Sequence, residues 1–411
     1  MILTVKNLGV ILLQYYFIHH LMCLYTMLKI FILNCCTIIM FCSVSCNQKR
    51  KNSQINYADD IYMLVGTYTS GSSNGIYVYR FNQKDGSAEY LSSVDVENPS
   101  YLVVSKDERF VYSVSENRTE SAYANAFSFN KQTGTLTYLN RQLTTGANPC
   151  YINTDFASKF VITANYSGGN VSVFPISDDG MLLPVSQVFD FESIMHKETP
   201  DPKSHLHSVV FSPDQKFIFA ADLGKDKIHK FVVNNISSPF IEQGVPDAFE
   251  LEAGSGPRHM VFHPNEKYAY MLNELSGNVT AFDYDDGNLN AIQYIAADTT
   301  SVSIHKGSAD IHVSPDGKFL YASTRVTSNG IAIFKINEAD GKLSFIDFQP
   351  TGIHPRNFII TPNGQYLLVA NRDSNNIQIF TIDKNIGLLR DTGKQLDINM
   401  PVCLKFISIS R

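Results

Sequence analysis

A segment of about fifty residues recurs along this chain, and the repeat limits the folds open to it. In five copies an apolar run ends at a turn containing Asp or Asn, and an aromatic residue follows three positions later; these copies start at Tyr101, His207, Arg258, Ile311 and Arg356. A sixth copy, starting at Cys150, is degenerate but in register, and a seventh start lies at Pro401. The anchoring aromatics are 50, 57, 51, 51 and 47 residues apart: Phe110, Phe160, Phe217, Tyr268, Phe319 and Tyr366.

Each copy reads as four short strands separated by turns. In the copy from Ile311, an apolar run meets Pro315-Asp-Gly317, and the alternating strand Phe319-Leu-Tyr-Ala-Ser follows. Turn residues at Ser328-Asn-Gly330 and Asp340-Gly341 then separate a third and a fourth strand. No amphipathic helical stretch intervenes, so the repeat predicts an all-β chain built from β-propeller blades.

The two ends of the chain supply one further blade between them. The strands Ile61–Thr67 and Gly75–Phe81, with the one after them, lack an inner strand, whereas Val402–Ser408 is an inner strand without the other three. Pairing them closes the ring and removes exposed sheet edges. We therefore predict a seven-bladed β-propeller over residues 59–411, with four-stranded blades and the N- and C-terminal strands sharing one blade.

The first 46 residues are different in character. Lys29 precedes a short apolar run and then Ser43-Val-Ser-Cys46, which is the pattern of a secretory signal and resembles the lipobox of bacterial lipoproteins. Met27 is an alternative start, and an uncleaved membrane anchor is the alternative reading. We expect residues 1–46 to be a signal peptide with lipidation at Cys46, and residues 47–58 to be a polar tether. The protein would then be an exported, periplasmic or outer-membrane-anchored lipoprotein of a Gram-negative bacterium; the alternative is cytoplasmic.

Composition narrows the range of partners. The formal net charge of −6 argues against nucleic acid, which selects a basic surface. Five of the seven cysteines lie in the leader, and only Cys150 and Cys403 belong to the repeats. We expect both to be small buried residues; a disulfide between them is the alternative in an oxidising compartment.

Equivalent positions of different blades lie on one ring around the channel, so the repeat brings distant residues together. One slot, at the start of each inner strand, holds Ser100, Cys150, His207, Arg258, Ala309, Arg356 and Val402. A second slot, six residues after the anchoring aromatic, holds Glu116, Tyr166, Leu223, Glu274, Arg325 and Arg372. The position before Glu274 is Asn273, and His205 and Asp310 lie beside the first slot.

These slots predict one pocket containing His207, Arg258, Glu274, Asp310, Arg325 and Arg356. Arginines there would bind an anionic group or a developing oxyanion, and Glu274 or His207 could serve as a general base. The alternative is a lattice of salt bridges between blades. His205 and His207 could share a metal ion, but no third ligand is evident and the arginines would repel a cation, so we expect no metal or other cofactor. We interpret His259 and His263 as structural, because they alternate away from Arg258 or lie at the turn.

The block Gly256-Pro-Arg258-His259 through Asn273-Glu274-Leu275 resembles the signature of the seven-bladed 6-phosphogluconolactonases, the bacterial lactonase family. Ala309 to Arg325, Gln349 to Phe358 and Asn165 to Phe174 are similar to that family as well. The resemblance implies hydrolysis of a sugar lactone without a metal. Fungal carboxy-muconate cyclases share the fold and pocket, and their His, two Arg and Glu would correspond to His207, Arg258, Glu274 and Arg325.

On this resemblance Glu274 or His207 would activate water, Arg258 would stabilise the oxyanion, and Arg325 with Arg356 would hold an anionic group. We expect His205, Asn273 and Asp310 to contact the substrate as well. The substrate would be 6-phosphogluconolactone, an intermediate of the pentose phosphate pathway, or a related aldonolactone, because the leader departs from the family's cytoplasmic members. We expect a monomer acting on a small anionic lactone. A non-catalytic binding propeller and a muconate-type lactone-forming cycloisomerase remain the alternatives.

Overall fold

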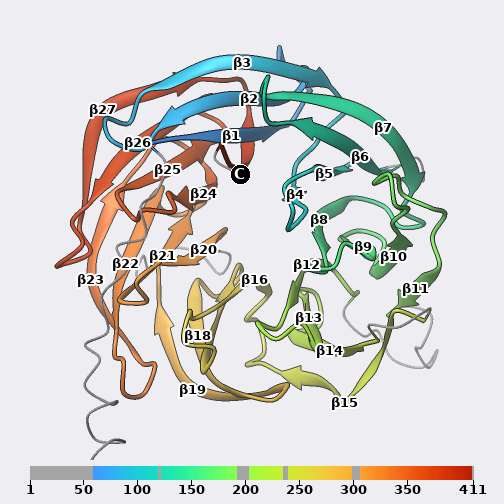
Figure 1. Ribbon diagram of the computed structural model, residues 1–411. Helices are drawn as coiled ribbons and strands as arrows, with labels where there is room; N and C mark the ends of the chain where they lie inside the picture. Colours follow the sequence, from blue (N-terminus) through green and yellow to red (C-terminus); the bar gives the residue numbers. More distant parts are fainter. Residues whose placement is uncertain (1–58, 119–121, 192–202, 235–238, 299–305, 410–411) are drawn as a thin grey trace, which may run out of the picture. The chain divides into compact units, whose positions relative to one another are not determined.

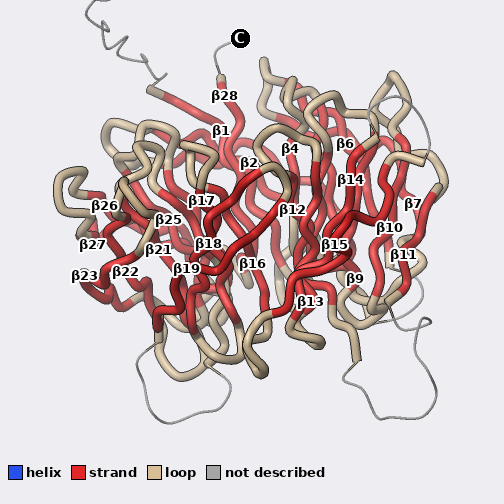
Figure 2. The backbone as a smooth tube through the Cα atoms, turned by 90° about the horizontal axis from the view of Figure 1, so that it is seen from below, coloured by secondary structure: helices blue, strands red, loops and turns tan. Residues whose placement is uncertain are grey.

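A computed structural model of the protein describes residues 59–118, 122–191, 203–234, 239–298 and 306–409. Within these ranges there is no helix, and seven antiparallel four-stranded sheets stand as blades around a central channel (Figures 1 and 2). The predicted seven-bladed β-propeller is confirmed. The expected signal peptide, its Cys46 and the tether at 47–58 lie outside the described residues. In the part of the chain that is described, no helix is long and apolar enough to cross a membrane.

Six blades are built from consecutive strands. Blade 1 comprises β4 (Leu102–Val104), β5 (Phe110–Ser115), β6 (Tyr123–Asn130) and β7 (Thr135–Leu143). Blade 2 comprises β8 (Pro149–Thr154), β9 (Phe160–Asn165), β10 (Asn170–Pro175) and β11 (Gln187–Asp190). Blade 3 comprises β12 (Leu206–Phe211), β13 (Phe217–Asp222), β14 (Lys227–Val233) and β15 (Ile241–Glu250). Blade 4 comprises β16 (Pro257–Phe262), β17 (Tyr268–Asn273), β18 (Asn278–Asp285) and β19 (Asn288–Ala296). Blade 5 comprises β20 (Ile311–Val313), β21 (Phe319–Thr324), β22 (Gly330–Ile336) and β23 (Leu343–Pro350). Blade 6 comprises β24 (Pro355–Ile360), β25 (Tyr366–Asn371), β26 (Asn376–Ile382) and β27 (Leu389–Asp397).

The seventh blade joins the two ends of the chain, as predicted. Its strands are β28 (Pro401–Ser408), β1 (Asp60–Thr67), β2 (Gly75–Asn82) and β3 (Ala88–Asp95), in that order from the channel outward. β28 pairs antiparallel with β1, from Ile61 opposite Ser408 to Thr67 opposite Pro401. The inner strand of this blade is therefore contributed by the end of the chain, and no edge of β1 is left unpaired.

The apolar core is divided into layers between neighbouring blades. One buried cluster joins Tyr270 and Leu272 of β17 to Leu320 and Ala322 of β21, and equivalent clusters fill the other interfaces. Because both faces of a blade are covered, the second strand of the repeat is buried along its whole length, as in β17 and β21. This burial explains the near-continuous apolar character of those strands.

Six of the seven interfaces between blades have a specific contact between an aromatic ring and a glycine. The anchoring aromatic of one blade packs against a glycine in the turn between the third and fourth strands of the next blade. At six interfaces a β-carbon added to that glycine would lie 2.1–3.0 Å from the ring, and all six glycines have positive φ. The pairs are Tyr62–Gly134, Phe110–Gly180, Phe217–Gly287, Tyr268–Gly341, Phe319–Gly387 and Tyr366–Gly86. The Asp-Gly turn in the sequence is therefore an inter-blade packing element as well as a turn signal.

Buried tyrosine hydroxyls strengthen the same interfaces. Tyr270 Oη donates to the carbonyl of Gly341 at 2.9 Å, and Tyr321 Oη donates to that of Gly387 at 2.9 Å. Tyr112 and Gly180 repeat the bond between blades 1 and 2 at 3.1 Å. The polar tip of each tyrosine is satisfied while its ring stays in the core.

We expect Gly341→Ala to destabilise the protein by about 2–4 kcal/mol, because the alanine would combine a strained positive φ with a clash against Tyr268. Gly393→Ala is the matched control, since Gly393 has a φ of 72° but no neighbour within 4 Å of an added β-carbon. The control should lose only the backbone contribution, about 1–2 kcal/mol. Urea unfolding followed by circular dichroism measures both; equal losses would contradict the packing role.

Candidate active site

Five of the seven inner strands depart from regular pairing at their start, and this irregularity aims side chains into the channel. In β12, β16 and β24 the register shifts by one residue, so that His207, Arg258 and Arg356 are each the extra residue of a β-bulge. Cys150 in β8 and Val402 in β28 occupy the same bulged position. Bulges re-aim side chains and are common next to active sites. Five of the seven residues of the first slot identified in the sequence are thus bulged, whereas Ser100 and Ala309 lie just before β4 and β20.

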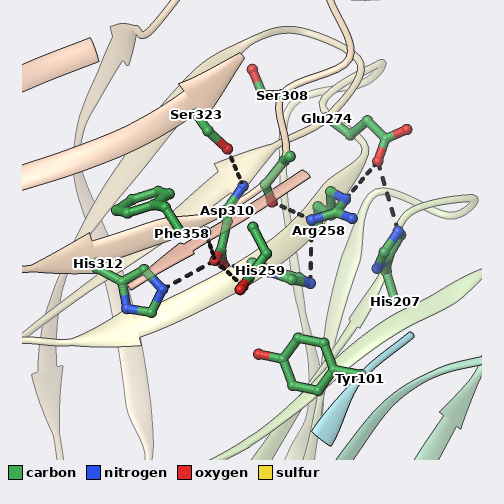
Figure 3. A network of polar contacts seen from close by, with 12 residues as sticks. Tyr101, His207, Arg258, His259, Glu274, Ser308, Asp310, His312, Ser323 and Phe358 are labelled. Carbon is green, nitrogen blue, oxygen red and sulfur yellow. Dashed lines mark hydrogen bonds and ion pairs between the residues drawn. The ribbon is translucent and has the colours of Figure 1, made fainter. Parts of the chain in front are cut away.

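Glu274 lies at the centre of the cluster that these bulges create. Its Oε2 is 2.8 Å from Nε of Arg258 and 3.7 Å from Nε2 of His207 (Figure 3). The same oxygen is 2.8 Å from Nη2 of Arg325. The four residues come from blades 3, 4 and 5 and are among the six that the repeat placed in one pocket. Only the Glu274 side chain keeps appreciable exposure, at 21%. A carboxylate held between two arginines therefore reaches the channel beside an imidazole.

The charges of this cluster follow from burial and proximity. Burial would raise the pKa of Glu274, but Arg325 and Arg258 outweigh it and hold the pKa below its usual value. Burial and the charge of Arg258 lower the pKa of His207 well below its usual range. Burial lowers the pKa of Arg325 to about 9. At neutral pH the site therefore holds an ionised Glu274, an uncharged His207 and a charged Arg325.

A network of buried polar contacts fixes Arg258 from behind. Its Nη1 donates to the carbonyl of Ala309 and lies 3.3 Å from Nε2 of His259. Nδ1 of His259 in turn lies 2.8 Å from Oδ1 of Asp310 (Figure 3). Burial and Arg258 lower the pKa of His259 to about 3, so the ring is uncharged. This uncharged ring can donate from Nδ1 to Asp310 and accept from Arg258 at Nε2.

Asp310 lies deeper than the sequence analysis expected. Its Oδ2 accepts from the backbone N–H of Phe358 at 3.3 Å and from Nδ2 of Asn357, and lies 3.0 Å from Nε2 of His312. Burial would raise the pKa of Asp310, but His312 and the hydrogen bond from His259 hold it well below the usual range. With both oxygens engaged by protein groups, Asp310 orients His259 and Arg258. Its contact with a substrate stays a prediction.

Arg325 and Arg356 differ in how many of their guanidinium nitrogens contact other protein groups. Nε of Arg325 donates to the carbonyl of Gly307 at 2.7 Å, and Nη1 lies 3.2 Å from Nε2 of His354, so all three nitrogens have partners. The nearest ionic partner of Arg356 in the described part of the chain is Glu116, whose Oε2 lies 3.7 Å from Nη2. Arg325 is therefore fixed as a clamp on Glu274, whereas Arg356 keeps donors for a ligand.

Two further predicted substrate-binding residues have structural partners. Asn273 is fully buried, and its Nδ2 donates to Oγ1 of Thr280 at 2.9 Å. His205 stacks on the ring of Tyr166 with centroids 4.5 Å apart, and its Nδ1 lies 3.0 Å from the Tyr166 carbonyl oxygen. His205 is half-buried beside His207, whereas Asn273 holds neighbouring strands together. Neither placement tests whether the residue binds the substrate.

The remaining side chains of interest take the following positions. Cys150 and Cys403 are both buried and free, and Sγ of Cys150 lies 3.6 Å from Nδ1 of His207. Arg372 pairs with Asp373 and does not join the Glu274 cluster. No group of three or more His, Cys, Asp or Glu side chains able to hold a metal ion occurs in the described ranges.

Sequence reasoning placed His259 wrongly and missed Tyr68. Strict alternation would turn His259 away from Arg258, but the bulge at Arg258 breaks the alternation and both side chains meet in the channel. Tyr68 donates to Oε2 of Glu116 at 2.9 Å. It lies six residues after the anchor Tyr62, so extending the second slot into the split blade would have found it.

The fold and this buried Arg, Glu and His set define a seven-bladed propeller with a polar, charged cluster facing its channel. Residues 62–406 match the family model described as lactonase, 7-bladed beta-propeller, and the chain belongs to this family. It is 40% identical over 353 residues to a 6-phosphogluconolactonase of Formosa agariphila, covering 85% of this chain and all of that protein.

Two solved structures are similar over the same region. A Bacteroides fragilis protein, provisionally named a 6-phosphogluconolactonase, is 51% identical with a TM-score of 0.81, over 85% of this chain and 98% of that one. The Pseudomonas aeruginosa periplasmic gluconolactonase is 33% identical with a TM-score of 0.79, over 85% and 99% of the two chains. The predicted family is confirmed.

We expect Asp310→Asn to cost about 2–3 kcal/mol at pH 7, because an amide cannot accept from all the donors that the carboxylate now satisfies. The folded-state pKa of Asp310 is depressed, so its ionic contribution exists above the unfolded value of about 3.9 and is lost as pH falls through the folded value. The stability gap between the two proteins should thus narrow only below about pH 4. Urea unfolding between pH 3 and 8 measures it; a constant gap would contradict an ionised Asp310.

Proposed function

We propose that the protein hydrolyses a sugar lactone at the mouth of its channel. The observation that carries the proposal is the Glu274 carboxylate fixed between Arg258 and Arg325, with the uncharged His207 3.7 Å away. The names of its family relatives, 6-phosphogluconolactonase and gluconolactonase, support the same reaction class. Lactone hydrolysis needs an activated water and a stabiliser for the tetrahedral oxyanion, and this set supplies both.

In this proposal both His207 and Glu274 contact the attacking water. The imidazole and the carboxylate are both unprotonated at neutral pH, so either can accept a proton. Because the Glu274 charge is already shared by two arginines, we assign the proton to His207 and the stabilisation of the resulting imidazolium to Glu274. Water oxygen adds to the carbonyl carbon, the ring C–O bond breaks, and the ring oxygen leaves as a hydroxyl after taking up that proton.

Arg258 stabilises the oxyanion in the same scheme. Its Nε faces Glu274 and its Nη1 is held by Ala309 and His259, so its orientation is fixed before the substrate arrives. No protein partner of Nη2 is found in the described residues, and this group can donate to the substrate. A donor that is already oriented pays no reorganisation cost in the transition state. Arg325, with all its nitrogens engaged, positions Glu274.

Export is the second part of the proposal. Lys29, the apolar run after it and Ser43-Val-Ser-Cys46 support a cleaved and lipidated leader, which would place the propeller outside the cytoplasm. An extracytoplasmic enzyme meets different lactones from a cytoplasmic one, so phosphorylated and unphosphorylated aldonolactones are both candidate substrates.

We expect the purified protein to accelerate opening of 6-phosphoglucono-δ-lactone or glucono-δ-lactone above the spontaneous rate, measured as proton release. Arg258→Ala should lower kcat/KM by on the order of 10²-fold or more, because it removes the oxyanion donor. Arg372→Ala, in the second slot but paired with Asp373, is the control and should stay near the wild-type rate. If neither lactone is turned over faster than in buffer, the proposed function is wrong.

We expect labelled fatty acid to be incorporated into the wild-type protein expressed in a Gram-negative host, and the protein to fractionate with membranes. Cys46→Ser should abolish the label, because the lipid is attached through the thiol. Cys42→Ser, four residues earlier in the leader, is the control and should keep it. Unlabelled wild-type protein in the soluble cytoplasmic fraction would refute the export proposal.

A further inference from the structure

A second Arg–Glu cluster lies in the same channel, formed by Tyr68, Glu116 and Arg356. Nη2 of Arg356 lies 3.7 Å from Oε2 of Glu116, and Tyr68 Oη donates to the same oxygen at 2.9 Å. The guanidinium also lies over the Tyr68 ring, 5.4 Å from its centroid. Tyr68 follows β1 of blade 7, Glu116 follows β5 of blade 1, and Arg356 lies in β24 of blade 6.

The cluster uses the same repeat positions as the catalytic one, but Arg258 and Glu274 belong to one blade whereas Arg356 and Glu116 belong to blades 6 and 1. Arg356 and Arg258 occupy the same bulged slot, and Glu116 and Glu274 occupy the same position at the end of the second strand. The two carboxylates differ in how many protein groups contact them. Glu274 is clamped by two arginines, whereas Glu116 has one hydroxyl and a distant guanidinium as its partners in the described part of the chain.

The open hydrogen-bonding groups of this cluster suit hydroxyls. The Arg356 guanidinium makes no hydrogen bond to another described residue, and Oε1 of Glu116 has no partner among them. The Arg356 and Glu116 side chains are 14% and 15% exposed, so both still reach the channel. A carboxylate acceptor beside a guanidinium donor can bind an alcohol group, which both donates and accepts.

The charge balance disfavours a phosphate group at this place. Arg258, Arg325 and Arg356 carry three positive formal charges, Glu116, Glu274 and Asp310 carry three negative ones, and His207 and His259 are uncharged. The charges of this set are therefore balanced before a substrate binds, and no surplus positive charge is left to offset a dianion. A phosphate monoester would bring about −1.5 to −2 further charge next to Glu116. Moreover, Arg356, the arginine with open donors, already faces that carboxylate.

We infer that Tyr68, Glu116 and Arg356 form a subsite for the hydroxyl groups of the sugar chain, and that the substrate class is uncharged polyhydroxy lactones. This inference rests on the proposed lactonase function. It assigns Tyr68 and Glu116, which the catalytic scheme does not use, to substrate recognition. It also replaces the anionic substrate expected from the sequence with a neutral one.

The test is kcat/KM on glucono-δ-lactone and on 6-phosphoglucono-δ-lactone for the wild-type protein and Glu116→Gln. We expect the wild type to prefer the uncharged lactone by at least about 10-fold, because a free hydroxyl can donate to the Glu116 carboxylate whereas a phosphate group would be repelled by it. Glu116→Gln should lower the uncharged lactone's kcat/KM about 10-fold, mainly through KM, and should raise that of the phosphorylated lactone.

Two further variants separate recognition from folding. Glu89→Gln makes the same charge change on the outer strand β3, where Glu89 is 67% exposed, and should leave the substrate ratio unchanged. Tyr68→Phe should shift the ratio in the same direction as Glu116→Gln but less, because only the hydroxyl is lost. A wild type that prefers the phosphorylated lactone, or a Glu116→Gln protein that loses both substrates equally, would overturn the inference while leaving the lactonase function intact. Absence of all turnover would instead overturn the function.

Discussion

The closed ring is the constraint on which the rest of this structure depends. A four-stranded blade is apolar on both faces, so every blade needs two neighbours, and the last neighbour exists only because β28 pairs with β1. The closure is tied to the site as well. Asn357 accepts from the backbone N–H of Leu404 in β28 and donates to Asp310, so the closing strand helps to hold the network behind Arg258.

A rigid ring makes the buried charges of the site tolerable. Taking a carboxylate and two guanidinium groups out of water costs several kcal/mol per ion unless partners are held in place. Here Glu274 has two arginines, Arg325 has two carbonyls and His354, and Arg258 has His259 backed by Asp310. Because these partners come from separate blades, the cluster cannot relax without loosening inter-blade packing. Stability of the scaffold is thus what keeps the reactive groups preorganised.

The sequence predicted the fold and the central cluster for a physical reason: a repeat with a fixed register converts sequence position into angular position around the channel. His207, Arg258, Glu274 and Arg325 were selected in this way and the structure brings them together. The register could not predict what happens within a strand. The bulge that admits His259 beside Arg258 depends on pairing geometry, and the depth of Asp310 depends on which donors meet it. Whether these residues bind a substrate remains a prediction.

The comparison of the two Arg–Glu pairs suggests how one scaffold separates chemistry from recognition. Both pairs use the same two repeat positions, although Arg258 and Glu274 lie in one blade and Arg356 and Glu116 lie in blades 6 and 1. A second guanidinium at Glu274 lowers the pKa of that carboxylate and fixes it, which suits a group that must stabilise charge near the reacting carbonyl. A tyrosine hydroxyl at Glu116 leaves a carboxylate with an open oxygen and a nearby donor, which suits reversible binding of alcohol groups. Within this ring, the identity of a single neighbouring side chain decides which role a repeated position takes.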